Sequence, residues 1–201
     1  MRVIAVWAHI DGNLASVLTN CLKTDITTGA AMYQALTGGD AKRAVLLAAA
    51  STRLSPDDFA IFNAALRVIK PSRDRRNDFA HNIWAYSAQV PNALLLMHSS
   101  VVINQNVAWR QYIEDHKKPI EVRDGIVRHV LPWPPAYKLD DSKIQVFKEG
   151  DLIRDLEIAE KADDIVMWLW RITHNVGGYD EGRTLLLNEP RIAAILQQPT
   201  P

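Results

Sequence analysis

The chain has one cysteine, no excess of charge of either sign and no long run of apolar residues. Cys21 has no second cysteine to pair with, so an internal disulfide is excluded and a reducing compartment, the cytoplasm, is expected. Lysine plus arginine and aspartate plus glutamate each number 23, so any contact with nucleic acid must come from a local patch. The longest apolar stretches, 44–50 and 165–170, are far shorter than the roughly 18 residues of a membrane span. No membrane partner is therefore expected.

The composition that is present is typical of a globular protein, with 48% hydrophobic and 23% charged residues in 201 positions. A chain of this length can bury one sizeable core. We expect a single domain over 1–201 that is mainly α-helical, a helical bundle with a small β insertion at about 90–147 and a long C-terminal helix. The helical core is predicted at 3–86 and 150–175, and a short terminal helix at 190–198.

Helical periodicity dominates the first half of the chain. Apolar residues recur three or four positions apart from Val3 to about Leu22, which places one stripe against a core. The sequence predicts three more helices, one capped by Thr27 or Thr28 and ending at Leu36, one from Ala41 to about Leu54, and one from Ser55-Pro56-Asp57-Asp58 to about Lys70. Pro71 disfavours helical geometry at the residue before it, so we predict a break or kink there and a further helix from Ser72 to about Tyr86.

Short strands are predicted in the middle of the chain, where prolines break helices and short apolar runs alternate with turn residues. The candidates are Ala93 to Met97, a hairpin from Ile120 to Val130 around Asp124-Gly125, and Ile144 to Phe147. After Gly150 a long helix is predicted, whose core stripe is Ile158, Ala162, Ile165, Leu169 and Ile172. Near Trp168 and Trp170 this helix is apolar on nearly all sides, so it is either buried in the middle of the fold or covered by a second subunit.

The most concentrated group of polar residues lies within 73–84. Asn77 and His81 are four positions apart, and Asp78 and His81 three apart, so either side chain can reach the imidazole and fix its tautomer. Histidine is the one side chain that titrates near neutrality when unperturbed, and a guanidinium such as that of Arg76 makes bidentate contacts with phosphate. The sequence therefore groups Arg76, Asn77 and His81 on the polar side of one predicted helix, where a cleft or a subunit interface can use them.

Residues 76–84, Arg-Asn-Asp-Phe-Ala-His-Asn-Ile-Trp, resemble the motif helix of the HEPN superfamily, which bears an arginine, four to six further residues and a histidine. Arg76 and His81 are separated by four residues, and Asn77 matches the polar residue that often follows the arginine. A strand similar to 91–96 commonly comes next in that family.

The resemblance implies a helical core that forms a homodimer and brings two copies of the motif together as a metal-independent endoribonuclease site. His81 would then transfer a proton as the 2′-hydroxyl of RNA attacks the neighbouring phosphate, Arg76 would stabilise the phosphate charge, and Asn77 would orient either one. The implied setting is a bacterial defence or toxin–antitoxin system, with RNA and an antitoxin protein as partners. No cofactor and no metal are expected, since neither an HExxH pattern nor paired cysteines occur.

Two further Arg–His pairs have a comparable spacing, Arg110 with His116 and Arg123 with His129. Both lie in the stretch predicted as strands and loops. Only the pair within 76–84 is therefore predicted to have the helical context of the family.

Basic and aromatic residues around the motif are candidates for substrate contacts. Arg73 and Arg75, with Lys70, form a basic run that can hold a phosphate backbone, and Trp84 or Tyr86 can stack on a base. Aspartates between the basic residues dilute their charge, so a solvated helix start is the alternative interpretation.

Two other functions stay open at this point. Arg76, Asn77 and His81 can pin helices together through buried hydrogen bonds in a non-enzymatic dimeric interaction module, with Trp168 and Trp170 in the contact. Exposure distinguishes this hypothesis from catalysis, because a catalytic histidine must reach solvent, whereas a structural one is buried with both ring nitrogens occupied. A domain that binds a small ligand between helices and sheet is the other possibility.

Overall fold

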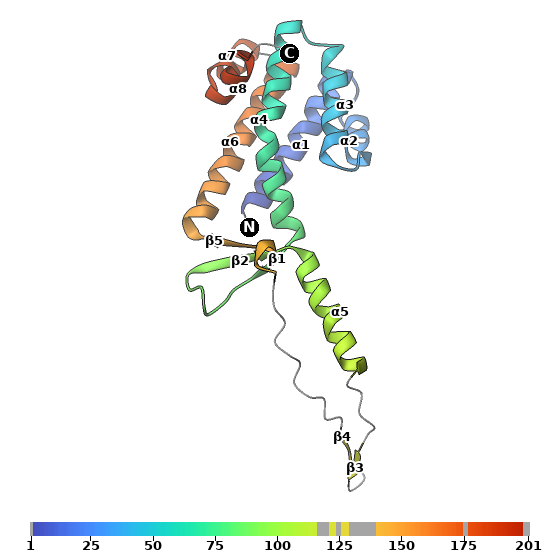
Figure 1. The fold of residues 1–201 in the computed structure, drawn as a ribbon. Helices are drawn as coiled ribbons and strands as arrows, with labels where there is room; N and C mark the ends of the chain where they lie inside the picture. Colours follow the sequence, from blue (N-terminus) through green and yellow to red (C-terminus); the bar gives the residue numbers. More distant parts are fainter. Residues whose placement is uncertain (1, 116–120, 124–125, 129–139, 175–176, 199–201) are drawn as a thin grey trace. The chain divides into compact units, whose positions relative to one another are not determined.

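The computed structural model describes residues 2–115, 121–123, 126–128, 140–174 and 177–198 (Figure 1). The chain divides into two compact units. The helical unit comprises Met1–Asp78 and Leu152–Pro201, and the sheet unit comprises Phe79–Asp151. Most of the described residues are helical, and a small antiparallel sheet accompanies them. The predicted mainly α fold with a small β region and a long C-terminal helix is therefore confirmed.

The helical unit is built from helices that bury one apolar face each. They are α1 (Arg2–Leu22), α2 (Ile26–Ala35), α3 (Gly39–Ser51), α4 (Pro56–His81), α6 (Glu149–His174), α7 (Tyr179–Asn188) and α8 (Pro190–Leu196); α4 ends and α6 begins in the sheet unit. Helices α2 and α3 pack on α1, and α7 packs on α8 (Figure 1). No helix in the described ranges is long and apolar enough to cross a bilayer.

The core of the helical unit is formed by the apolar stripes of α1, α4 and α6. Trp7, Phe62 and Leu169 contribute one large buried side chain from each. The Trp7 indole N–H donates to Ser72 Oγ at 3.0 Å, so a buried donor is satisfied across α1 and α4. The stripes predicted for the first helix and for the long C-terminal helix are buried at Ile10, Leu14, Val17, Cys21, Ala162, Ile165, Leu169 and Ile172. The prediction is wrong at Ile158, which is 37% exposed near the start of the long helix. Removal of this apolar surface from water is the main stabilising contribution.

The turn from α1 into α2 depends on two small details of sequence. The N-cap of α2 is Asp25, whose carboxylate accepts the Thr28 N–H at 2.9 Å, so the predicted cap at Thr27 or Thr28 is wrong by a few positions. Gly29 then faces α1, where a Cβ would collide with Thr19 Oγ1. Glycine is required at this position for the two helices to approach each other so closely.

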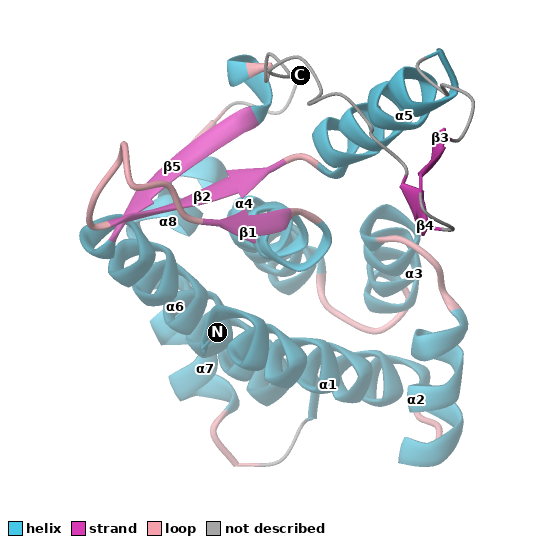
Figure 2. Cartoon of the chain, turned by 90° about the horizontal axis from the view of Figure 1, so that it is seen from below, coloured by secondary structure: helices cyan, strands magenta, loops and turns pink. Residues whose placement is uncertain are grey.

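The sheet unit holds a three-stranded antiparallel sheet in the order β1-β2-β5 (Figure 2). Its strands are β1 (Ile83–Ala85), β2 (Ala93–Met97) and β5 (Ile144–Lys148), and a separate pair is formed by β3 (Glu121–Arg123) and β4 (Ile126–Arg128). Helix α5 (Ser99–Asp115) follows β2, and a 3-10 turn (Asp141–Lys143) precedes β5. The strands predicted at 93–97, at 144–147 and within 120–130 are confirmed, whereas the turn predicted at 124–125 lies outside the described residues.

Both faces of the three-stranded sheet are mostly apolar, with Gln145 on one and Lys148 on the other. On one face Trp84 packs against Phe79 and Phe147, with ring centroids 5.2 and 5.7 Å away. On the other face the register forms two rows of apolar residues, Ile83, Met97 and Ile144 in one and Ala85, Leu95 and Val146 in the other. Val146 is 50% exposed and Ile83 is 37% exposed, so the second face is only partly covered by described residues.

Helix α4 differs from the prediction at two points. It runs through Pro71, so the predicted break at Lys70 is wrong. Proline removes the hydrogen bond to the carbonyl of Arg67, but both residues are exposed, and water can take the missing bond. The predicted helix end at Tyr86 is also wrong, because α4 ends at His81 and Ile83–Ala85 pairs with β2 instead.

Two helices were not predicted. Helix α5 occupies 17 residues of the stretch that was predicted as strands and loops. Helix α7 begins directly after Gly178, whose φ of 110° is in the left-handed region that glycine adopts most easily. Gly178 therefore lets the chain turn directly into this helix.

Candidate functional site

Arg76, Asn77 and His81 all lie on α4, and the division between the two units falls just before Phe79. Arg76 and Asn77 belong to the helical unit, and His81, the last residue of α4, belongs to the sheet unit. The segment is helical because Ser72 and Phe79 are buried while polar side chains fill the positions between them.

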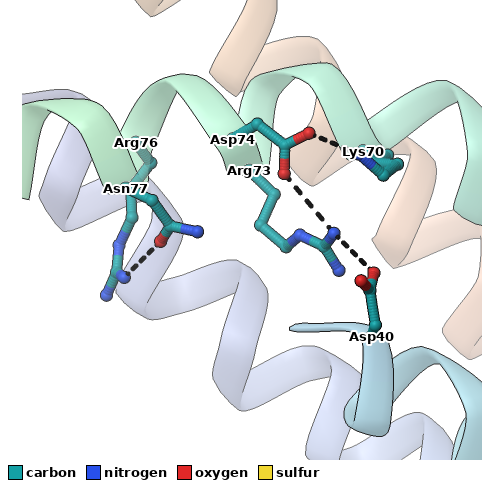
Figure 3. Close-up of polar contacts among 6 residues, drawn as sticks. All are labelled: Asp40, Lys70, Arg73, Asp74, Arg76 and Asn77. Carbon is teal, nitrogen blue, oxygen red and sulfur yellow. Dashed lines mark hydrogen bonds and ion pairs between the residues drawn. The ribbon is translucent and has the colours of Figure 1, made fainter. Parts of the chain in front are cut away.

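Arg76 and Asn77 form a half-buried pair. Arg76 Nη1 donates to Asn77 Oδ1 at 3.0 Å, so the amide oxygen orients the guanidinium (Figure 3). Arg76 Nε is buried and has no hydrogen-bond partner among the described residues. A buried guanidinium N–H without a partner is unfavourable, and an oxyanion is the strongest acceptor that it can take. The pair is therefore suited to hold a negatively charged group.

His81 is exposed, and its ring makes no hydrogen bond within the part of the chain that the structure describes. A proton-transfer group needs this access to solvent and to a substrate. A histidine that holds helices together would instead be buried with its ring nitrogens bonded. The environment of His81 therefore favours a chemical role over a structural one.

The basic run before the motif is paired with carboxylates (Figure 3). Lys70 Nζ lies 2.6 Å from Asp74 Oδ2, and Arg73 Nη2 donates to Asp40 Oδ1 at 3.2 Å and to Asp74 Oδ1 at 3.4 Å. Burial alone would raise the pKa of Asp74, but hydrogen bonds and charges from Lys70 and Arg73 outweigh it and hold that pKa below its ordinary value. Much of the positive charge of this run is therefore neutralised locally.

The other residues predicted to contact substrate have different surroundings. Arg75 is 39% exposed on its side chain and forms an ion pair with Asp155 at 3.5 Å. Trp84 is half-buried in the aromatic cluster, and its indole N–H donates to the Phe79 carbonyl at 3.2 Å. Tyr86 is 83% exposed. Of the two aromatic residues, Tyr86 presents the freer ring for stacking on a base.

We predicted that only the pair Arg76 and His81 lies on a helix, and this does not distinguish it from the pair Arg110 and His116. Arg110 lies on α5, which is a helix and not a loop. Its partner in the pattern, His116, lies outside the described residues, as does His129. The adjacent asparagine and the exposed histidine remain the features that distinguish the pair within 76–84.

Trp168 and Trp170, the residues predicted for a subunit contact, are half-buried on α6. Lys161 Nζ lies over the Trp168 ring, 4.8 Å from its centroid, and Trp170 stacks on His174 with centroids 4.5 Å apart. Each ring therefore has a partner within the chain and still keeps exposed surface.

A buried polar cluster at the start of α4 was not predicted. Asp58 accepts hydrogen bonds from Tyr179 Oη at 2.6 Å, Ser55 Oγ at 2.8 Å and Arg183 Nε at 3.1 Å. Burial alone would raise the pKa of Asp58, but these three bonds outweigh it and hold that pKa below its ordinary value. The same bond to Asp58 raises the pKa of Tyr179. The start signal at 55–58 was visible in the sequence, but the partners on α7 were not, and the cluster joins α7 to α4.

No protein-family model, curated protein or solved structure matches the chain. Its function must therefore follow from its own residues.

Proposed function

We propose that this protein is an HEPN-like, metal-independent endoribonuclease or RNA-binding protein that acts as a homodimer. The observation that carries the proposal is the presence of two chemical features on one helix, α4. His81 offers an exposed imidazole, and Arg76 offers a guanidinium that Asn77 orients and whose Nε lacks a partner among the described residues. Proton transfer and phosphate recognition are the two functions that RNA cleavage without a metal needs.

In the proposed reaction His81 takes the proton from a 2′-hydroxyl of RNA, and the 2′-oxygen forms a bond to the adjacent phosphorus. The bond from phosphorus to the 5′-oxygen breaks, and that oxygen takes a proton from the protonated imidazole of the second copy. The products are a 2′,3′-cyclic phosphate and a 5′-hydroxyl. Arg76 stabilises the charge that builds on the phosphate oxygens, and Asn77 fixes its direction.

The proposal extends to the contacts and setting of this site. The exposed ring of Tyr86 or the half-buried ring of Trp84 stacks on a base, and Arg73 and Arg75, which also bind carboxylates, add guanidinium groups within three residues of Arg76. The half-buried tryptophans on α6 lie in the homodimer contact. The resemblance over 76–84 supports a bacterial defence or toxin–antitoxin setting in the cytoplasm, with an antitoxin protein as a further partner.

A second candidate is a non-enzymatic dimeric interaction module in which the motif is structural. The half-buried bond from Arg76 to Asn77 favours it, because such a pair also stabilises a helix without any ligand. The two candidates differ in what His81 does.

The test is cleavage of a mixed RNA substrate in the presence of EDTA by the wild type and by His81→Ala. His98→Ala is the matched control, since His98 is another exposed histidine of the sheet unit. Circular dichroism and light scattering check folding and oligomeric state for each protein. We expect the wild type and His98→Ala to leave cyclic-phosphate ends and the folded His81→Ala to lose about a hundredfold or more in rate.

A wild type that neither cleaves nor binds RNA would overturn the proposal. Unchanged cleavage by His81→Ala would refute the assignment of the histidine. Loss of folding in His81→Ala, with no cleavage by the wild type, would instead support the interaction module.

A further inference from the structure

The helical unit contains a small cavity between α1, α2, α3 and α4, apart from the residues of the motif. It measures about 40 Å³, which is room for a few water molecules or one compact ion and far too little for a nucleotide or a cofactor. Its lining is partly apolar and partly polar, and the polar part is called the rim: Asp11, Tyr33, Lys42, Arg43, Lys70 and Arg73. The chemistry of the rim therefore decides what it holds.

The rim is rich in positive charge. Four cationic side chains line it, Lys42, Arg43, Lys70 and Arg73, against a single carboxylate, Asp11. Asp40 and Asp74 bind Lys70 and Arg73 without lining the cavity (Figure 3). The four cationic side chains outnumber the carboxylates of Asp11, Asp40 and Asp74 by one, so one positive charge has no carboxylate to balance it.

The cations differ in how fully they are used. Lys42 Nζ lies 3.4 Å from Asp11 and 4.3 Å from the centroid of the Tyr33 ring. Arg43 donates to the neutral amide oxygen of Asn63 at 2.8 Å and has no carboxylate partner among the described residues. Arg73 Nε is buried and has no hydrogen-bond partner among the described residues. Arg43 therefore keeps its charge for a ligand, and Arg73, whose charge is paired with Asp40 and Asp74, keeps one buried donor.

Tyr33 adds a neutral donor to the rim. Burial raises its pKa strongly, and the charge of Asp11 raises it further, so the phenol stays protonated. Its hydroxyl donates to Asp11 Oδ1 at 3.0 Å. Asp11, the one carboxylate among the described lining residues, therefore binds both Tyr33 and Lys42.

Arg73 has an unusual neighbour in Gly39, the first residue of α3. A Cβ at Gly39 would collide with the Arg73 guanidinium, so glycine makes the room that this group occupies. The helix start has no side-chain cap, and its dipole places partial positive charge where the guanidinium already lies. A bound anion would balance the charge of the guanidinium and the partial charge of the helix start.

We propose that this cavity binds one phosphate group of the RNA on which the protein acts, an inference that rests on the proposed function. Arg43 and Arg73 supply the charged contacts, and Lys42 and Lys70 supply the surrounding field. Arg73 precedes Arg76 by three positions on α4, within one helical turn, so a phosphate held here continues the contacts of the motif. The phosphate comes from the RNA backbone or from a 5′ end, and the experiment separates the two.

Inorganic phosphate is the first probe, measured by calorimetry on the full chain. The test variant is Arg43→Gln, which removes the charge and shortens the side chain, and the control is Arg67→Gln, an exposed arginine of α4 that does not line the cavity. Arg73→Lys is a second variant that keeps the charge and removes the fork. We expect one phosphate per chain in the wild type and in Arg67→Gln, and binding weaker by about tenfold or more in both cavity variants once folding is confirmed.

The second probe is a short RNA with either a 5′-phosphate or a 5′-hydroxyl, followed by fluorescence anisotropy. Preference for the 5′-phosphate that disappears in Arg43→Gln would assign the cavity to the chain end. Equal binding of both RNAs, weakened alike in the variant, would assign it to the backbone. RNA binding and phosphate binding that are the same in Arg43→Gln, Arg73→Lys and the wild type would overturn the inference while the proposed function stands. Phosphate binding in the cavity without any RNA binding would overturn the proposed function and, with it, RNA as the source of the phosphate, while the cavity itself would stand as an anion site.

Discussion

Asp58→Asn is expected to cost the helical unit about 3 kcal/mol of unfolding free energy. The substitution keeps the size of the side chain, but it removes a charge on which Tyr179, Ser55 and Arg183 converge. A hydrogen bond to a charged group contributes about 1.5–3 kcal/mol. The amide oxygen of asparagine retains part of this, and Arg183, with 36% of its side chain exposed, regains water when its partner is lost. These two effects place the value near the lower end of the roughly 3–5 kcal/mol for breaking a buried pair.

The loss depends on pH in a direction that follows from the pKa of Asp58. Hydrogen bonds hold the folded-state pKa below the unfolded one, so the ionised carboxylate stabilises the fold at pH values above the unfolded pKa, near 4. That contribution disappears as the pH falls through the folded-state pKa. The difference in stability between wild type and Asp58→Asn should therefore be constant above about pH 5 and should narrow below about pH 4.

The measurement is urea denaturation followed by circular dichroism, with Asp57→Asn as the matched control. Asp57 is exposed in the same first turn of α4, so its loss removes only a helix-dipole contribution of about 0.5 kcal/mol. Tyr179→Phe and the double variant complete a cycle whose coupling energy is expected to be at least about 1 kcal/mol. Equal stabilities of Asp57→Asn and Asp58→Asn, or a difference that widens in acid, would refute the reasoning.

Two further results are expected elsewhere in the helical unit. Burial raises the pKa of the Cys21 thiol to about 11, so the native protein should resist a thiol reagent at pH 8 and react quickly in concentrated urea; fast native labelling would contradict the burial. Pro71→Ala should raise the unfolding free energy by about 1–2 kcal/mol, because proline in a helix interior costs about 3 kcal/mol relative to alanine and its loss from the unfolded chain offsets part of that gain. A urea midpoint that does not increase would show that Pro71 makes a stabilising contact.

The sequence predicted those helices and strands that depend on residues close together in the chain. The stripes of α1 and α6 follow from apolar spacing, and the start of α4 follows from Ser55-Pro56-Asp57-Asp58. Strands β2 and β5 follow from short apolar runs between turn residues. In each case residues close in sequence determine the element.

What could not be predicted depends on partners far away in the chain. The sequence of Ile83–Ala85 continues the helical pattern of α4, but the pairing of this segment with β2 outweighs its helical propensity. Pro71 is tolerated because of where it lies on α4, which local rules do not reveal. The motif residues were found from spacing and resemblance, whereas the pairing of Arg76 with Asn77 and the exposure of His81 required the structure.

The sheet with two mostly apolar faces has a consequence for how the strands choose their alignment. In most antiparallel sheets a slip of one residue moves apolar side chains into water, and this cost fixes the pairing. Strand β2, Ala-Leu-Leu-Leu-Met, is apolar at every position. A shift of this strand by one residue therefore replaces apolar side chains with other apolar side chains on each face of the sheet. The penalty must then come from the aromatic trio of Phe79, Trp84 and Phe147, which fits only one alignment. Truncation of Phe147 should therefore allow several strand registers to coexist. Truncation of other core residues should instead leave a single register with lower stability.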